Sequence, residues 1–207
     1  MKTKTLRPIF NLVLAALVAY AWYLMIFRGT GALQTTGLKS LKYFTVLSNL
    51  LEGFASLFYF LRRNNETDPL RDTLKYTAAG AVTLTLLVVL GFLGPIFGYP
   101  FMFRGANFYF HLLIPLLSIA EFIFWNTGEM GKKENRVMML PIALYGVYYL
   151  GNIAINGIGT FPNKNDWYGF FLFGNKIAVV IIILLFSLNY MIGFTLRKLN
   201  RKITKRQ

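Results

Sequence analysis

The feature that constrains the fold most is a series of six long stretches in which charged side chains are almost absent. Each stretch approaches or exceeds the roughly 20 apolar residues that a helix needs to cross the hydrocarbon core of a bilayer. Backbone polar groups find no water there, so each segment must satisfy its own hydrogen bonds, as an α-helix does. The sequence therefore predicts an all-α polytopic integral membrane protein, a single domain over residues 1–207 with a bundle of six transmembrane helices. The expected spans are residues 8–27, 41–61, 76–96, 107–126, 137–157 and 167–196.

The positions of the charged residues predict how the chain is oriented. Hydrophobic residues make up 56% of the 207 and charged residues 14%, yet the net charge is +14. In a soluble protein that surplus would suggest nucleic-acid binding. Here the basic residues gather before the first span, between spans two and three, between spans four and five, and after span six. By the positive-inside rule, this alternation predicts that both termini are cytoplasmic, with membrane lipids and not nucleic acid as partners.

The sequence excludes several kinds of active site. It contains no cysteine and one histidine, so disulfides, a thiol nucleophile and a thiolate metal site are ruled out. The HExxH, GxSxG and GxGxxG motifs and the Walker and EF-hand loops are also absent. Because the carboxylates are not clustered, we expect neither a metal nor a cofactor. Acid–base or nucleophilic chemistry without a cofactor is left open.

Polar side chains inside the expected spans fall on helical stripes. Intramembrane polar groups are costly, so such stripes must face protein or water. In the second span, polar residues recur at i, i+3, i+4, i+7 and i+11. Because a helix turns about 100° per residue, this spacing puts them on one face. That face carries Thr45, Ser48, Asn49, Glu52 and Ser56. The fifth span has a similar stripe of Tyr145, Tyr149, Asn152 and Asn156.

Depth predicts which of these groups meet. Thr45 and His111 each lie four residues into a span that starts at the outer surface, so both are expected about 6 Å below it. The fifth and sixth spans bring further polar groups near this level, namely Asn152, Asn156, Asn175 and Lys176. We therefore expect an outward-facing pocket where these side chains converge.

Two carboxylates lie deeper. Glu52 is expected about 10 Å below Thr45 and level with Lys176, so the two could form an intramembrane pair with either a packing or a catalytic role. Glu121 follows His111 by ten residues, about 15 Å along the axis, and is expected to extend toward the inner interface. The sequence does not identify which group, if any, orients His111, and Asp166 and Glu52 are only two candidates.

The residue types offer one reactive pair and several plain alternatives. Histidine has the unperturbed pKa closest to neutrality, so His111 is the candidate base and Thr45 the candidate nucleophile. Equally, a threonine early in a helix often bonds a backbone carbonyl. A membrane histidine can serve packing, and the asparagines can join helices through hydrogen bonds.

The segment Leu41-Lys42-Tyr43-Phe44-Thr45, with His111 followed ten residues later by Glu121, resembles the androgen-induced-gene family of membrane proteins, and most closely a bacterial branch. Animal members of that family are intramembrane hydrolases of fatty acid esters of hydroxy fatty acids, with a threonine nucleophile and a histidine. The resemblance implies that Thr45 is the nucleophile and His111 the general base. One interval differs, because Pro115 follows the histidine by four residues where the family pattern has five.

The resemblance thus implies an intramembrane lipid esterase, a threonine/histidine hydrolase of the bacterial plasma membrane. The oxyanion donors or pocket walls would come from the remaining polar residues, namely Ser48, Asn49, Glu52, Tyr149, Asn152, Asn156, Asn175 and Lys176. Two other functions stay open: a membrane acyltransferase that uses the same pair, and a non-enzymatic transporter or binding protein for a lipid or small molecule. The oligomeric state and the natural substrate are not predicted.

Overall fold

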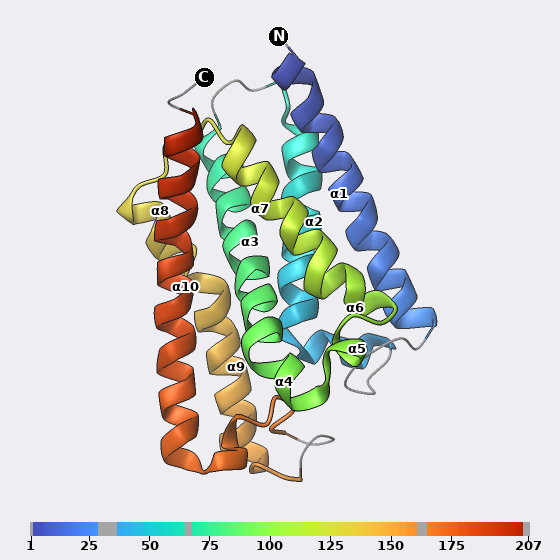
Figure 1. Cartoon of the computed structure of the whole chain (residues 1–207), viewed down its shortest axis with the longest axis vertical. Helices are drawn as coiled ribbons and strands as arrows, with labels where there is room; N and C mark the ends of the chain where they lie inside the picture. The colour runs from blue at the N-terminus through green and yellow to red at the C-terminus, as the bar shows by residue number, and fades with distance from the viewer. Residues whose placement is uncertain (1, 29–36, 65–67, 161–164, 205–207) are drawn as a thin grey trace.

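The computed structural model describes residues 2–28, 37–64, 68–160 and 165–204, and this part of the chain is a bundle of helices (Figure 1). Within it, six helices are long and apolar enough to cross a membrane: Leu6–Phe27, Phe44–Leu61, Pro69–Phe97, Ala106–Trp125, Lys132–Asn156 and Asn175–Thr204. The prediction of an all-α, polytopic integral membrane protein with six spans is confirmed.

Several spans are assembled from more than one element. The elements in chain order are α1 (Lys2–Phe27), η1 (Gly37–Lys42), α2 (Phe44–Leu61), α3 (Pro69–Val88), η2 (Val89–Leu93), α4 (Gly94–Phe97), α5 (Tyr99–Met102), α6 (Ala106–Phe108), η3 (Tyr109–Leu113), α7 (Ile114–Trp125), α8 (Lys132–Val137), α9 (Leu140–Asn156), η4 (Phe170–Phe173) and α10 (Asn175–Thr204). The third span is α3 continued by η2 and α4, and the fourth is α6, η3 and α7 in succession. Both η2 and η3 are π-helical turns, whereas η1 and η4 are 3₁₀.

The two ends of the bundle differ in what they contain. The start of α1 and the end of α10 lie at one end, with α8, the end of α2 and the start of α3, and we call it the terminal end (Figure 1). The other end, the distal end, holds η1, α4, α5 and the segment before α10. Helices α1, α2, α3 and α7 form the centre, α10 packs on α3 and α7, and α9 makes few contacts with the other helices.

The third and sixth spans differ most from the expected bounds. The third begins at Pro69, because Asp68 caps the helix by accepting the Arg71 N–H at 3.1 Å and Pro69 follows it. The sixth was expected at 167–196, but α10 runs from Asn175 to Thr204. Gly174, at φ 89°, separates it from an aromatic segment that folds into the core. The sequence did not separate this segment from the span, because aromatic residues raise the mean hydropathy of a segment whether it forms a helix or a packed loop.

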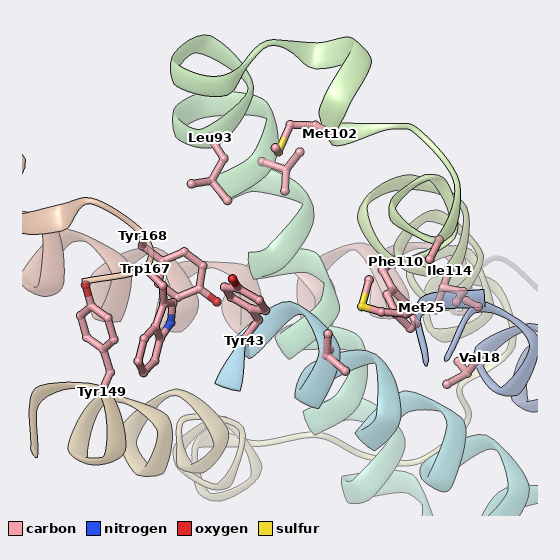
Figure 2. Packing of buried hydrophobic residues seen from close by; sticks show 14 of the residues in the cluster. Val18, Met25, Tyr43, Leu93, Met102, Phe110, Ile114, Tyr149, Trp167 and Tyr168 are labelled. Atoms are coloured by element: carbon pink, nitrogen blue, oxygen red, sulfur yellow. The ribbon is translucent and has the colours of Figure 1, made fainter. Parts of the chain in front are cut away.

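Close packing of the central helices depends on small residues. A Cβ on Gly53 of α2 would lie 2.7 Å from Cγ1 of Val18 on α1, so only glycine allows this approach. The buried apolar side chains form two clusters. The distal one includes Tyr43, Phe110 and Trp167, and Figure 2 shows it filling the space between α2, the fourth span and the segment before α10.

Candidate active site

A pocket lies between α2, α3, α9 and α10 in the distal half of the bundle, and Thr45 forms part of its wall. Most of the lining is apolar, from residues such as Leu84, Val88 and Ile142. Thr45 is 9% exposed. Its hydroxyl bonds no other residue in the described part of the chain, so the early-helix back-bond expected of a structural threonine is not made. This hydroxyl is available to a molecule in the pocket.

His111 lies on the fourth span within the π-turn η3 and is buried. Its Nδ1 is 2.6 Å from the carbonyl oxygen of Met102. A carbonyl only accepts, so this bond requires the proton on Nδ1 and leaves Nε2 as an unprotonated acceptor. Nε2 bonds no described residue. The orienting group, which the sequence does not identify, is thus a main-chain carbonyl and neither Asp166 nor Glu52.

The π-turn around His111 follows from the proline behind it. The Ile114 N–H donates to the Tyr109 carbonyl, five residues back, and Pro115 has no N–H to offer. The Phe110 carbonyl therefore has no helical donor. Asn49 of α2 supplies one, with Nδ2 3.0 Å from that oxygen. Single π-turns inside α-helices are frequently found at functional sites.

Asn49 also fixes the relative height of the two candidate residues. Its Nδ2 donates both to the Thr45 carbonyl at 2.7 Å and to the carbonyl of Phe110, the residue before His111. One buried amide thus ties the turn that carries Thr45 to the turn that carries His111. The structure does not join the reactive atoms themselves: no hydrogen bond links the Thr45 hydroxyl to His111 within the described residues, and His111 does not line the Thr45 pocket.

A second π-turn, η2, lies at the distal end of α3 and has the same construction. The Gly94 N–H donates to the Val89 carbonyl, and Pro95 has no N–H. The Leu90 carbonyl is left without a helical donor and accepts the Tyr99 hydroxyl at 2.7 Å. Both turns are thus five residues long, both end one residue before an X-Pro step, and both rely on a side chain from elsewhere.

The segment before α10 forms a cap on the N-terminus of α2. The Tyr168 hydroxyl accepts the Phe44 N–H at 2.7 Å, and burial raises the pKa of Tyr168, so the hydroxyl stays protonated. The Tyr145 hydroxyl donates to the Lys42 carbonyl at 2.7 Å and accepts the Trp167 Nε1–H at 2.9 Å. Figure 2 shows Trp167 and Tyr168 lying between Tyr43 and Tyr149.

Asp166 is the anchor of this cap, a role that the sequence did not reveal. It is buried, and it accepts the Tyr149 hydroxyl and the main-chain N–H groups of Phe170 at 3.0 Å and Phe171 at 2.9 Å. Tyr149 therefore belongs to the cap, although it also lines the Thr45 pocket. Three donors on one carboxylate are enough to hold a buried charge without a cation.

Most of the other expected site residues do not converge on Thr45. Ser48 is an exception, because its hydroxyl bonds the Thr45 carbonyl at 3.1 Å and the Thr85 hydroxyl at 3.0 Å. Asn152 and Asn156 bond each other at 3.0 Å, with Asn156 exposed. Asn175 and Lys176 are exposed at the distal end, because α10 starts eight residues later than expected. The predicted convergence of spans five and six was wrong for these four residues, which are Asn152, Asn156, Asn175 and Lys176.

The deep carboxylates are paired, but not with the expected partners. Glu52 is bonded to Lys75, and Lys176 is not involved. Glu121 does not extend to the interface: it is fully buried and bonded to Arg7 at 2.7 Å, with the Lys75 ammonium 3.7 Å from its other oxygen. Arg7 and Lys75 belong to the basic residues that flank the expected spans, and the structure buries both. Arg7 and Asn11 share a helix face at i, i+4 spacing, which was a usable signal.

No group of three or more His, Cys, Asp or Glu side chains that could hold a metal ion occurs among the described residues. Comparisons with protein-family models, curated proteins and solved structures give no match to this chain. The distal end thus holds two unbonded atoms, the Thr45 hydroxyl and His111 Nε2, on turns tied by Asn49, with an apolar pocket beside the hydroxyl.

Proposed function

We propose that the protein is an intramembrane hydrolase of lipid esters, with Thr45 as nucleophile and His111 as general base. The observation that carries the proposal is the state of His111: Met102 holds the proton on Nδ1, so that Nε2 is a free base beside the turn tied to Thr45. The unbonded Thr45 hydroxyl in an apolar pocket supplies the second part. The resemblance to the androgen-induced-gene family points to the same two residues.

Thr45 and His111 have separate roles in the proposed hydrolysis. Thr45 Oγ1 attacks the ester carbonyl while its proton passes to His111 Nε2, directly or through one water. Collapse of the tetrahedral intermediate breaks the ester bond, and the leaving alkoxide takes the proton from His111. Water then attacks the acyl-threonine while His111 Nε2 accepts one of its protons. The second tetrahedral intermediate breaks the bond between Thr45 Oγ1 and the acyl carbon, His111 returns the proton to Oγ1, and the fatty acid leaves. Binding in an apolar pocket favours an ester with a long hydrocarbon chain.

We place the protein in a bacterial plasma membrane with both termini in the cytoplasm. The support is the gathering of Lys and Arg at the terminal end of the bundle. In that orientation the Thr45 pocket lies in the outer half of the bilayer. Substrate would reach it from the membrane and not from the aqueous phase.

The test compares Thr45→Ala and His111→Ala with Thr83→Val in purified protein. Thr83 lies outside the pocket on α3, and its hydroxyl bonds the Ala79 carbonyl of the same helix at 2.6 Å, so Thr83→Val is the control. We expect each of the first two variants to lose about 10²- to 10⁴-fold in turnover of a long-chain ester, with the control near wild type. Turnover that persists in Thr45→Ala, or fluorophosphonate labelling that does, contradicts the assignment.

A further inference from the structure

A second apolar hollow lies next to the Thr45 pocket, on the other side of the contact between α3 and α10. Its volume is about 340 Å³. Its walls carry no charged or hydrogen-bonding side chain, and they are Leu87, Val88, Gly91, Phe92, Phe170, Ile181, Leu184, Leu185 and Leu188. We call it the α3–α10 groove. Because α3 and α10 are both membrane-spanning, the groove is accessible from the lipid.

The groove exists because of a glycine in a π-turn. Gly91 lies in η2, and a Cβ placed there would have no atom within 4 Å. Every larger residue would project into this space. The π-turn also displaces the neighbouring side chains of α3 by one position relative to an α-helix, so that Phe92 forms part of the wall.

Three side chains separate the groove from the candidate nucleophile. Val88, Phe170 and Leu185 line both the groove and the Thr45 pocket. The Thr45 pocket has a volume of only about 70 Å³, which is less than the roughly 300 Å³ of the smaller ligand sites. An ester group and a few carbons fill it, and the rest of a long chain must lie elsewhere. The groove is the adjoining space with room for it.

We propose that the α3–α10 groove binds the fatty acyl chain of a membrane lipid and delivers its carbonyl end past Val88, Phe170 and Leu185 into the Thr45 pocket. The inference rests on the proposed function for the direction of the chain. A chain fits better than a headgroup, because the walls offer no donor, acceptor or charge. It fits better than a helix of another subunit, since a helix about 10 Å wide cannot pass between α3 and α10.

The test measures chain binding separately from hydrolysis. The full-length protein in lipid nanodiscs is irradiated with palmitic acid that carries a diazirine in mid-chain, and the labelled residues are mapped by mass spectrometry. We expect labelling on Leu87, Leu184 or Leu188, competed away by excess palmitate. Thr45→Ala must keep this labelling, because it removes the nucleophile and leaves the groove intact.

The decisive variant is Gly91→Leu, and its control is Gly151→Leu on α9. Neither glycine has an atom within 4 Å of a Cβ position, so both variants are expected to fold. Only the first fills the groove, and we expect it to lower labelling and to raise KM for a palmitoyl ester about tenfold, with a butyryl ester unaffected.

The outcomes separate the two proposals. Labelling that excess palmitate does not compete, or that is equal in Gly91→Leu and Gly151→Leu, overturns the groove while the chemistry at Thr45 stands. Cross-links from Leu184 or Leu188 to a second protein in place of palmitate also overturn it. Competed labelling in a protein that hydrolyses no ester supports the groove and removes the esterase.

Discussion

The two ends of the bundle differ in how their buried carboxylates are stabilised. At the terminal end, Glu52 with Lys75 and Glu121 with Arg7 pair opposite charges across α2, α3, α7 and α1. At the distal end the buried carboxylate, Asp166, is held by neutral donors alone. These two ion pairs each join different helices, so at the terminal end buried charge links the helices together.

At the distal end, two reactive atoms make no hydrogen bond to a described residue, although the groups around them are hydrogen-bonded to one another. Tyr168 and Tyr145 bond the backbone around the start of α2, and Asn49 bonds the turn before His111. Within that frame, neither the Thr45 hydroxyl nor His111 Nε2 bonds a described residue. Rigid surroundings with free reactive atoms are what a catalytic site requires.

The largest effect is expected from breaking the terminal-end network. Among the described residues, Lys75 is the cation bonded to Glu52, so Lys75→Met leaves this fully buried carboxylate without its countercharge. We expect a loss of about 3–5 kcal/mol in the free energy of unfolding, because an uncompensated buried charge is left behind. Denaturation in mixed detergent micelles, followed by circular dichroism, measures it.

The double variant Lys75→Met/Glu52→Gln is the sharper half of this test. Removing the orphaned charge should recover most of the loss, because a neutral pair of similar volume avoids the desolvation cost. Lys176→Met is the control, since Lys176 is exposed and should stay within about 0.5 kcal/mol of wild type. A double variant no more stable than Lys75→Met would show that the pair is not an electrostatic unit.

The helices could be predicted because hydropathy and backbone bonding in lipid are local properties. Six spans followed from apolar length alone, and the helical spacing of Thr45, Ser48, Asn49 and Glu52 predicted one buried face, which the structure confirms. The start of α10 could not be predicted, because the aromatic residues after Asp166 are as apolar as a span.

The partners of the buried groups depend on tertiary contacts that no local pattern records. Lys75 lies beside a polar connection in the sequence, yet its long side chain reaches Glu52 on another helix. The Met102 carbonyl that holds His111 is a main-chain group, and any residue at position 102 could supply it. The group that orients His111 therefore could not be identified from side-chain types.

A smaller effect is expected from weakening the distal cap. Tyr149→Phe removes one of three donors to Asp166, and a bond to a charged group contributes about 2 kcal/mol. The loss should be confined to the distal end, so hydrogen exchange at the Phe44 amide should accelerate while the terminal-end amides of α3 are unchanged. Tyr148→Phe is the control, because Tyr148 is 48% exposed on the same helix. Equal acceleration at both ends would contradict the independence of the two regions.

The smallest effect tests how η3 is built, through a double-mutant cycle. Asn49→Ala leaves the Phe110 carbonyl without a donor because Pro115 has no N–H, whereas Pro115→Ala provides an N–H on the same helix. Asn49→Ala should therefore cost about 1 kcal/mol less in the Pro115→Ala background than in wild type. Pro95→Ala is the matched control, because it alters the equivalent turn η2, whose Leu90 carbonyl is bonded by Tyr99 and not by Asn49. The effects of Pro95→Ala and Asn49→Ala on the free energy of unfolding should simply add. A coupling between these two variants as large as that between Pro115→Ala and Asn49→Ala would mean that Asn49 acts through the bundle as a whole and not through the turn that holds His111.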